Sequence, residues 1–186
     1  MKYYEALGIE PRLALDLDAL KKRFYELSRE WHPDRFSRAS ASEQQKALDK
    51  TAVLNDAFRT LKEPVSRAEY FLEESGIPPS KNPPPELLEE MFELNEALEE
   101  LRGTGFSLSS ESDRLKPVPP QLIEAQKKYG KMLDEVAEQL DTLFKQHDEH
   151  RERAALQEIR GILDRRRYVA NLMRDVEKEL NVHVSN

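Results

Sequence analysis

His32, Pro33 and Asp34 form a tripeptide whose side chains could bind another protein. The Pro33 ring fixes its own backbone angle and removes an N–H donor, so it stiffens the segment. An exposed Asp34 carboxylate could accept a bidentate hydrogen bond from an arginine of a partner, and His32 could orient the loop. The alternative is structural: Asp34 caps the following turn, while His32 and Pro33 only end a helix.

Two histidines in the second half of the chain suggest a different chemistry. His147 and His150 are three residues apart, so one side of a helix can present both, with Asp148 and Glu149 nearby. Metal sites use such pairs, but no third ligand is evident and the chain contains no cysteine. No catalytic triad, phosphate-binding glycine loop or dinucleotide fingerprint is evident either. We therefore expect structural or solvated histidines, no metal or other cofactor, and no enzymatic activity.

The composition favours an all-helical protein. Of the 186 residues, 38% are hydrophobic and 35% are charged, and glycine is rare. The formal net charge of -7 argues against general nucleic-acid binding, which needs a basic face.

No window is apolar enough to span a bilayer, and no secretory signal is evident. We expect a monomer in the bacterial cytoplasm, or in the mitochondrial matrix if this is a processed form.

Two paired helices are expected to position the tripeptide. The first covers residues 16–31 and ends because Pro33 excludes the helical conformation from the residue before it. The second runs from about residue 42 to just before Pro64, and a third from Pro64 to Gly76. Apolar residues recur at helical spacing in the first two: Leu20, Phe24, Leu27 and Trp31, then Ala47, Thr51, Leu54, Phe58 and Leu61.

The remaining chain predicts an antiparallel three-helix bundle. We expect a first domain at 1–75, a proline-rich linker at 76–85 and the bundle at 86–186, with an irregular connection at 103–120. The bundle helices are expected at 85–102, 122–147 and 152–180. Their predicted buried positions are Leu87, Met91, Leu94, Leu98 and Leu101; Leu122, Tyr129, Leu133, Val136, Leu140 and Leu143; and Leu156, Ile159, Leu163, Ala170 and Met173.

Leu88 and Phe92 fall outside the predicted buried stripe of their helix, by the period of 3.6 residues. Glutamates at positions 89, 93 and 96 surround them, which favours a partner with a basic surface. Tyr168 and Leu172 point away from the stripe predicted for the last helix and could extend this surface. The alternative is that both pairs fill a wider bundle or pack against the first domain.

The tripeptide lies between two apolar-faced helices, after "YYEALGI" and before "LNDAFRTLKEPVSRAEYFL". This arrangement resembles the J-domain of DnaJ-type co-chaperones over about residues 1–75. The resemblance implies an all-α domain whose loop contacts a heat-shock-70 class chaperone and triggers ATP hydrolysis by that partner. The residues expected to contact the chaperone are His32, Pro33, Asp34, Lys21, Lys22, Tyr25, Arg29 and Arg35, with Arg23 also available from the side.

The segments "KEPVSRAEYFLE" and "FELNEALEEL" extend the resemblance to nearly the whole chain, which is similar to the HscB-type co-chaperones of iron–sulfur cluster biogenesis. The implied partners are the chaperone HscA or DnaK and the cluster scaffold IscU. Glu89 and Asn95 depart from the enterobacterial pattern, which has an apolar residue and an arginine there. The open alternatives are a J-domain co-chaperone, or a helical adaptor, for a different client. The implied scaffold-binding residues are Leu88, Phe92, Glu93, Glu96 and Tyr168.

Overall fold

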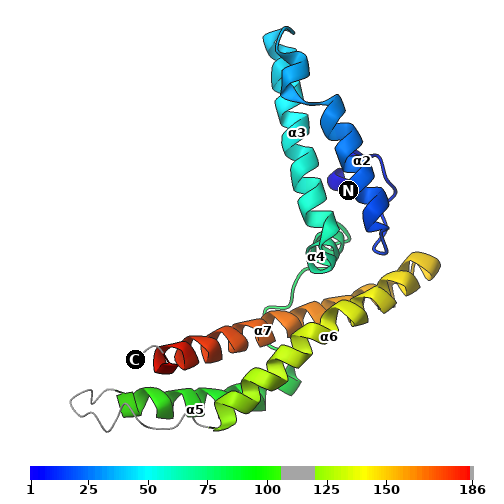
Figure 1. Cartoon of the computed structure of the whole chain (residues 1–186). Helices are drawn as coiled ribbons and strands as arrows, with labels where there is room; N and C mark the ends of the chain where they lie inside the picture. Colours follow the sequence, from blue (N-terminus) through cyan, green and yellow to red (C-terminus); the bar gives the residue numbers. More distant parts are fainter. Residues whose placement is uncertain (106–119, 185–186) are drawn as a thin grey trace. The chain divides into compact units, whose positions relative to one another are not determined.

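The computed structural model describes residues 1–105 and 120–184, and every element in those ranges is a helix (Figure 1). This confirms the predicted all-α class. The elements are α1 (Lys2–Leu7), α2 (Leu17–Glu30), the 3-10 helix η1 (Pro33–Phe36), α3 (Ala41–Lys62), α4 (Pro64–Glu74), the 3-10 helix η2 (Pro85–Leu87), α5 (Leu88–Gly105), α6 (Pro120–His150) and α7 (Arg153–Val184). None of the described helices has the length and hydropathy needed to cross a membrane.

The chain folds as two compact units. The N-terminal unit comprises Met1–Pro78 and Ala137–Arg160, and the bundle unit comprises Pro79–Val136 and Gly161–Asn186. The first boundary between the two units, after Pro78, lies in the segment expected to be the linker, 76–85. The expected division placed all of 86–186 in one domain, whereas the end of α6 and the beginning of α7 pack with the N-terminal unit.

The α2–α3 pair forms because each helix carries its own start signal and one apolar face. The Asp16 carboxylate accepts hydrogen bonds from the first turn of α2, and Ser40 forms a capping box with Glu43 at the start of α3. Between the helices, the rings of Phe24 and Phe58 stack with centroids 4.3 Å apart. The buried positions of the two helices are Leu20 and Leu27 in α2, and Ala47, Leu54, Ala57 and Leu61 in α3.

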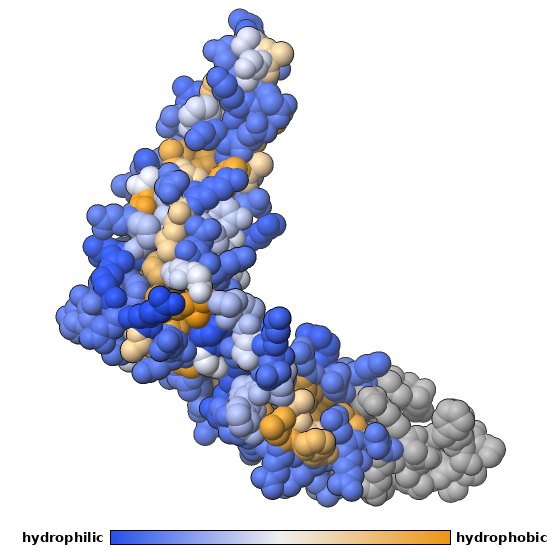
Figure 2. Space-filling model, turned by 180° about the vertical axis from the view of Figure 1, so that it is seen from behind, coloured by the Kyte–Doolittle hydropathy of each residue, from blue (hydrophilic) through white to orange (hydrophobic). Residues whose placement is uncertain are grey.

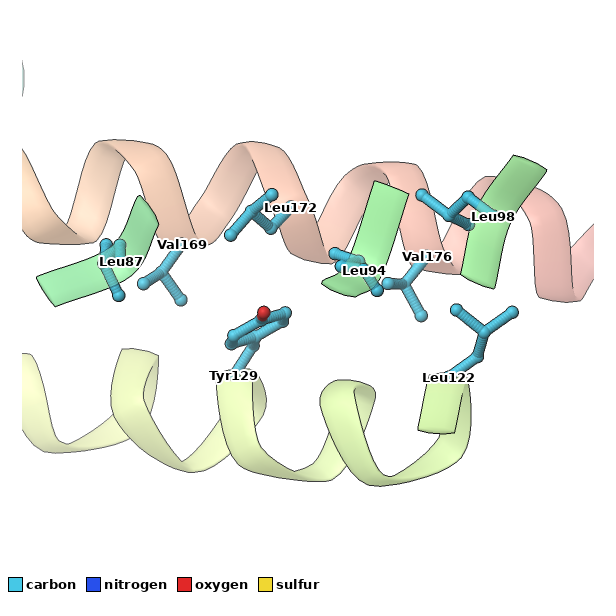
Figure 3. Packing of buried hydrophobic residues seen from close by; sticks show 8 residues of the cluster. All are labelled: Leu87, Leu94, Leu98, Leu122, Tyr129, Val169, Leu172 and Val176. Carbon is cyan, nitrogen blue, oxygen red and sulfur yellow. The ribbon is translucent and has the colours of Figure 1, made fainter. Parts of the chain in front are cut away.

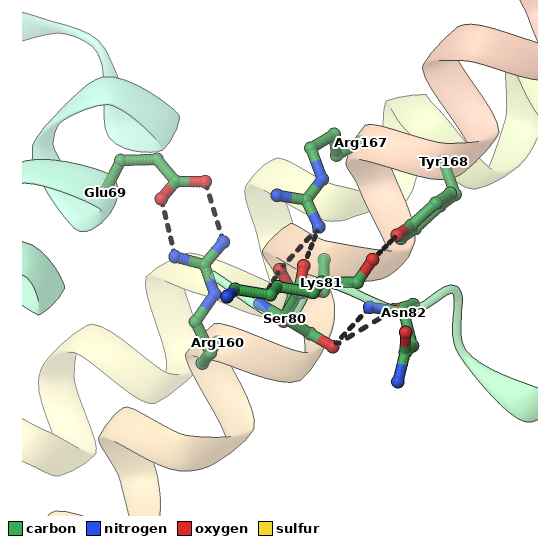
Figure 4. Close-up of polar contacts among 8 residues, drawn as sticks. Glu69, Ser80, Lys81, Asn82, Arg160, Arg167 and Tyr168 are labelled. Atoms are coloured by element: carbon green, nitrogen blue, oxygen red, sulfur yellow. Dashed lines mark hydrogen bonds and ion pairs between the residues drawn. The ribbon is translucent and has the colours of Figure 1, made fainter. Parts of the chain in front are cut away.

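The α6–α7 turn is tied into the N-terminal unit by polar contacts. The Asp148 carboxylate accepts the backbone N–H of Leu13 at 3.0 Å and that of Ala14 at 2.8 Å. Arg160 donates to both carboxylate oxygens of Glu69, at 2.6 and 2.8 Å (Figure 4). Charge-assisted bonds of this kind are the strong ones, so this turn is a structural part of the unit.

His147 belongs to the same packing. Its side chain is 5% exposed, and its ring meets the Phe71 ring edge-on with centroids 5.3 Å apart. Its Nδ1 atom lies 3.4 Å from the Asp148 carboxylate. The Asp148 oxygens are in turn occupied by backbone N–H groups. No group of three or more potential metal ligands converges within the described residues.

The bundle unit has one apolar core, to which three helices contribute (Figure 3). Its fully packed members are Leu87, Leu94 and Leu98 from the first of these helices and the turn before it, Leu122 and Tyr129 from α6, and Val169, Leu172 and Val176 from α7. The stripes predicted for α5 and α6 are therefore confirmed, with Met91 and Leu133 partly buried at the core edge. The side chain of Leu101 lies outside the described residues.

The stripe predicted for α7 is correct only in its first half. Leu156, Ile159 and Leu163 are buried as expected, but Ala170 and Met173 are only partly buried. Further along, Val169, Leu172 and Val176 face the core instead. Leu172 is 6% exposed, so the expectation that it extends an outer surface is wrong. A stripe spaced every seven residues, such as Leu156, Leu163 and Ala170, drifts by about 20° per repeat around a helix of 3.6 residues per turn. The neighbours present at each level of the 32-residue helix then decide which side is covered.

The proline-rich segment after α4 is held against α7 within the bundle unit. The Ser80 N–H donates to the Asp164 carboxylate at 3.2 and 3.1 Å, and Arg167 donates back to the Ser80 carbonyl (Figure 4). The Tyr168 hydroxyl donates to the Lys81 carbonyl at 3.2 Å. This part of the linker is therefore fixed by specific contacts to one helix.

Replacing Asp148 with alanine should destabilise the protein, because two backbone N–H groups lose their acceptor. An unsatisfied donor of this kind costs about 1–3 kcal/mol, so we expect the free energy of unfolding to fall by about 2 kcal/mol in urea denaturation followed by circular dichroism. The matched control is Glu149→Ala, whose side chain is 74% exposed. That change should stay within about 0.5 kcal/mol of the parent. Equal losses in both variants would contradict the role given to Asp148.

Candidate functional site

The His32–Asp34 corner has the backbone that a residue before proline must adopt. The last α2 residue is Glu30, and His32 is extended, with φ -61° and ψ 128°. Pro33 then begins η1, where its missing N–H would have no partner in any case. The His32 Nδ1 atom accepts the Asp34 backbone N–H at 3.3 Å. The cap of this turn is thus His32, and the alternative in which Asp34 caps it is wrong.

The Asp34 carboxylate projects into solvent. Its side chain is 91% exposed and that of His32 is 57% exposed, and their closest polar atoms are 3.6 Å apart. A carboxylate presented this way keeps most of its acceptor positions open. It can therefore receive two parallel N–H groups from a partner arginine without first losing an internal partner.

The corner is exposed to solvent, but side-chain contacts with α2 and α3 hold its backbone in place. The Trp31 and Phe36 rings stack with centroids 5.8 Å apart. The Thr51 hydroxyl of α3 donates to the Trp31 carbonyl at 3.0 Å, and Arg35 donates to the Arg29 carbonyl at 3.3 Å. These contacts fix both ends of the turn, so the tripeptide is presented in one conformation.

The outer face of α2 carries the expected basic residues, with two qualifications. Lys21, Lys22 and Arg29 are exposed, and the Tyr25 side chain between them is also exposed. Arg23 is not free for docking, because its Nε atom donates to the Leu7 carbonyl at 3.0 Å. Arg35 is exposed but also makes the bond to α2 described above. The α2 face, defined here as Lys21, Lys22, Tyr25 and Arg29, joins the corner at its C-terminal end.

A second exposed surface lies on α5. Leu88 is 41% exposed and Phe92 is 74% exposed, so the alternative that these two residues fill the bundle interior is wrong. Exposed glutamates at positions 89, 93 and 96 accompany them on this helix. We call Leu88, Phe92, Glu93 and Glu96 the α5 strip. Among the large hydrophobic side chains that the structure describes, Phe92 is the most exposed, and most of the face drawn in Figure 2 is hydrophilic with a few apolar patches.

Tyr168 differs from the other predicted scaffold-binding residues. It is half-buried, it packs partly against the bundle core, and its hydroxyl holds the Lys81 carbonyl. The Arg167 guanidinium lies over its ring, 5.1 Å from the centroid. The structure therefore gives Tyr168 a role in holding the linker, which sequence periodicity did not indicate.

Sequence analysis also missed a hollow of about 310 Å³ between α5 and α6. Its lining includes Glu90, Glu93, Glu124, Lys128 and Tyr129. Burial raises the pKa of the Tyr129 hydroxyl to about 12, and the charges of Glu90 and Glu93 act in the same direction. The only sequence signal was Tyr129 itself, a residue with a polar end on an otherwise apolar stripe.

Comparisons with known proteins give one family match and several related proteins. Residues 2–70 match the DnaJ domain family. HscB co-chaperone homologues of Vibrio vulnificus and Neisseria meningitidis are each 39% identical over 105 residues, which is 54% of this chain. The aligned segment spans 61% and 63% of those relatives, less than two thirds of their length.

Two solved structures resemble nearly the whole chain. The chaperone HscB from Vibrio cholerae aligns with a TM-score of 0.61 and 28% identity, covering 97% of this chain and 98% of that one. Human co-chaperone protein HscB aligns with a TM-score of 0.60 and 25% identity, covering 96% and 82%. Residues 2–70 thus match the DnaJ domain, and over nearly its whole length the chain is similar to HscB co-chaperones.

Proposed function

We propose that this protein stimulates ATP hydrolysis by a heat-shock-70 class chaperone of the HscA or DnaK type, and delivers the iron–sulfur cluster scaffold IscU to it. The observation that carries the proposal is the rigid, exposed corner at His32, Pro33 and Asp34, with an exposed α5 strip on the same chain. The compartment that suits these partners is the bacterial cytoplasm or the mitochondrial matrix.

The corner acts on the chaperone without doing chemistry itself. The exposed Asp34 carboxylate can pair with an arginine of the chaperone, while Pro33 and the Trp31–Phe36 stack keep the carboxylate in place. A preorganised group loses little conformational entropy on binding, so more of its interaction energy appears as affinity. The α2 face adds positive charge that suits an acidic chaperone surface and accelerates encounter.

The α5 strip provides the grip on the scaffold. Burying a Leu or Phe side chain contributes about 1.5–3 kcal/mol, so covering Leu88 and Phe92 supplies a binding core. Glu93 and Glu96 at its edge favour a basic rim on the partner and disfavour an acidic one. Binding scaffold and chaperone to one chain raises the effective concentration of each for the other. The two proteins therefore meet more often than they would as separate molecules in solution.

A different client is the second candidate, and two residues favour it. Glu89 and Asn95 are both exposed beside the α5 strip, and they stand where the enterobacterial pattern has an apolar residue and an arginine. The surface here is therefore more acidic and less apolar than that pattern. Direct binding of purified IscU separates the two candidates, because a J-domain protein for another client would stimulate the chaperone but not bind this scaffold.

His32→Gln should abolish stimulation of the chaperone, because the corner loses the imidazole that caps its turn and faces the partner. We expect steady-state ATP turnover to fall to the chaperone's basal rate, with scaffold affinity unchanged by calorimetry. The matched control is His150→Gln, an exposed histidine at the end of α6, which should stimulate normally. Both variants should unfold within about 0.5 kcal/mol of the parent. Full stimulation by His32→Gln would refute the assignment of this corner.

The double change Leu88→Ala and Phe92→Ala should separate the two activities. It removes the apolar centre of the α5 strip, so scaffold affinity should weaken at least tenfold by calorimetry. Stimulation of the chaperone without scaffold should persist, while the extra stimulation that scaffold adds should disappear. Leu48→Ala is the control, since Leu48 is 50% exposed on α3, away from the strip in the sequence. Unchanged scaffold affinity in the double variant would remove the client assignment.

A further inference from the structure

The hollow between α5 and α6 holds two polar groups that no described residue fully satisfies. One carboxylate oxygen of Glu90 receives the Lys128 ammonium at 2.8 Å, while the other, the buried Oε2 atom, makes no hydrogen bond to a described residue. Tyr129 is 2% exposed, and its hydroxyl makes no hydrogen bond to any described residue. A buried acceptor left without a donor is unfavourable, so a ligand that donates to Glu90 and also reaches the Tyr129 hydroxyl is favoured there.

The charge of the hollow specifies a cation. Three carboxylates line it, from Glu90, Glu93 and Glu124, against the single ammonium of Lys128. Because the carboxylates outnumber the ammonium, the lining is net negative. The Lys128 ammonium contacts only one oxygen of Glu90. An entering cation would meet unbalanced negative charge in a partly desolvated place, where attraction is stronger than in water.

The shape of this charge favours an extended cation over a metal ion. No three of the described acidic or histidine side chains converge closely enough to ligate a metal. A guanidinium has five N–H donors in a planar fork, so it can reach a carboxylate with one edge and a phenolic oxygen with another. The hollow of about 310 Å³ has room for such a side chain.

We propose that this hollow receives an arginine side chain of the protein that docks on the α5 strip, and that Glu90 and Tyr129 are its acceptors. The inference rests on the proposed function, because it takes the scaffold as that protein. Glu93 connects the two places, since it belongs to the strip and also lines the hollow. A scaffold seated on Leu88 and Phe92 would then be fixed in register by one buried charged contact beside an apolar one.

Glu90→Gln and Tyr129→Phe test the proposal with little change in shape. Glu90→Gln removes the negative charge of one acceptor, and Tyr129→Phe removes the hydroxyl of the other. Each should weaken scaffold affinity about tenfold by calorimetry, which corresponds to about 1.4 kcal/mol. The control Glu177→Gln makes the same charge change at an exposed site on α7 and should bind like the parent. Circular dichroism melts establish that all three variants are folded.

The outcomes separate this inference from the proposed function. If the parent binds scaffold and the Leu88 and Phe92 double variant does not, but Glu90→Gln and Tyr129→Phe bind like Glu177→Gln, the hollow has no role and the inference is overturned alone. If the parent does not bind scaffold, the proposed function fails and the inference falls with it.

A small probe tests the chemistry of the hollow directly. N-acetylarginine amide should shift the backbone amide signals of Leu94 and Lys128 in NMR spectra of the full chain, and Glu90→Gln should suppress those shifts. The neutral isostere N-acetylcitrulline amide should leave both signals in place. Equal shifts from the two probes, or shifts that persist in Glu90→Gln, would overturn the assignment of a guanidinium site.

Discussion

The α2–α3 contact is the constraint on which the proposed chaperone site depends. Each helix has one apolar face, and burying Leu27 against α3 requires the two to run side by side. Residues 31–40 must then reverse the chain. Pro33 begins that reversal, because it excludes the helical conformation from His32 and starts a new turn itself. The tripeptide is exposed because the core lies on the other side of the helices, and the Trp31–Phe36 stack and the Thr51 hydroxyl hold it in place.

In the bundle unit, too, each helix buries one apolar face, but here an apolar pair remains on the surface. Three helices need one shared core, to which Leu87 of η2 and Leu94 and Leu98 of α5 contribute. A helix that uses only one side for packing leaves the opposite side to solvent, where polar residues are the norm. Leu88 and Phe92 break that norm on α5. An apolar pair that the core does not need is a place where another protein gains by covering it.

Buried carboxylates hold the irregular segments of both units. Asp148 secures the loop before α2 by accepting two backbone N–H groups, and Asp164 secures the linker through Ser80. Loops lack a regular partner for their N–H groups, so an acidic side chain on a neighbouring helix is an efficient acceptor. Glu90 is the contrast, because one of its oxygens is buried and accepts from no residue in the described part of the chain. The same chemistry that fixes loops elsewhere is left open in the hollow between α5 and α6.

Helix limits and the corner could be predicted from the sequence because near neighbours determine them. Caps such as Asp16 and Ser40, and the restriction that Pro33 places on His32, act within four residues. The helical period placed Leu88 and Phe92 outside the buried stripe, as found, but the same argument failed for Leu172. Tertiary structure alone decided which side of α7 is buried after Leu163, why His147 packs on Phe71, and that Glu90 and Tyr129 share a hollow. Those outcomes depend on residues far apart in the chain, whose meeting no local pattern encodes.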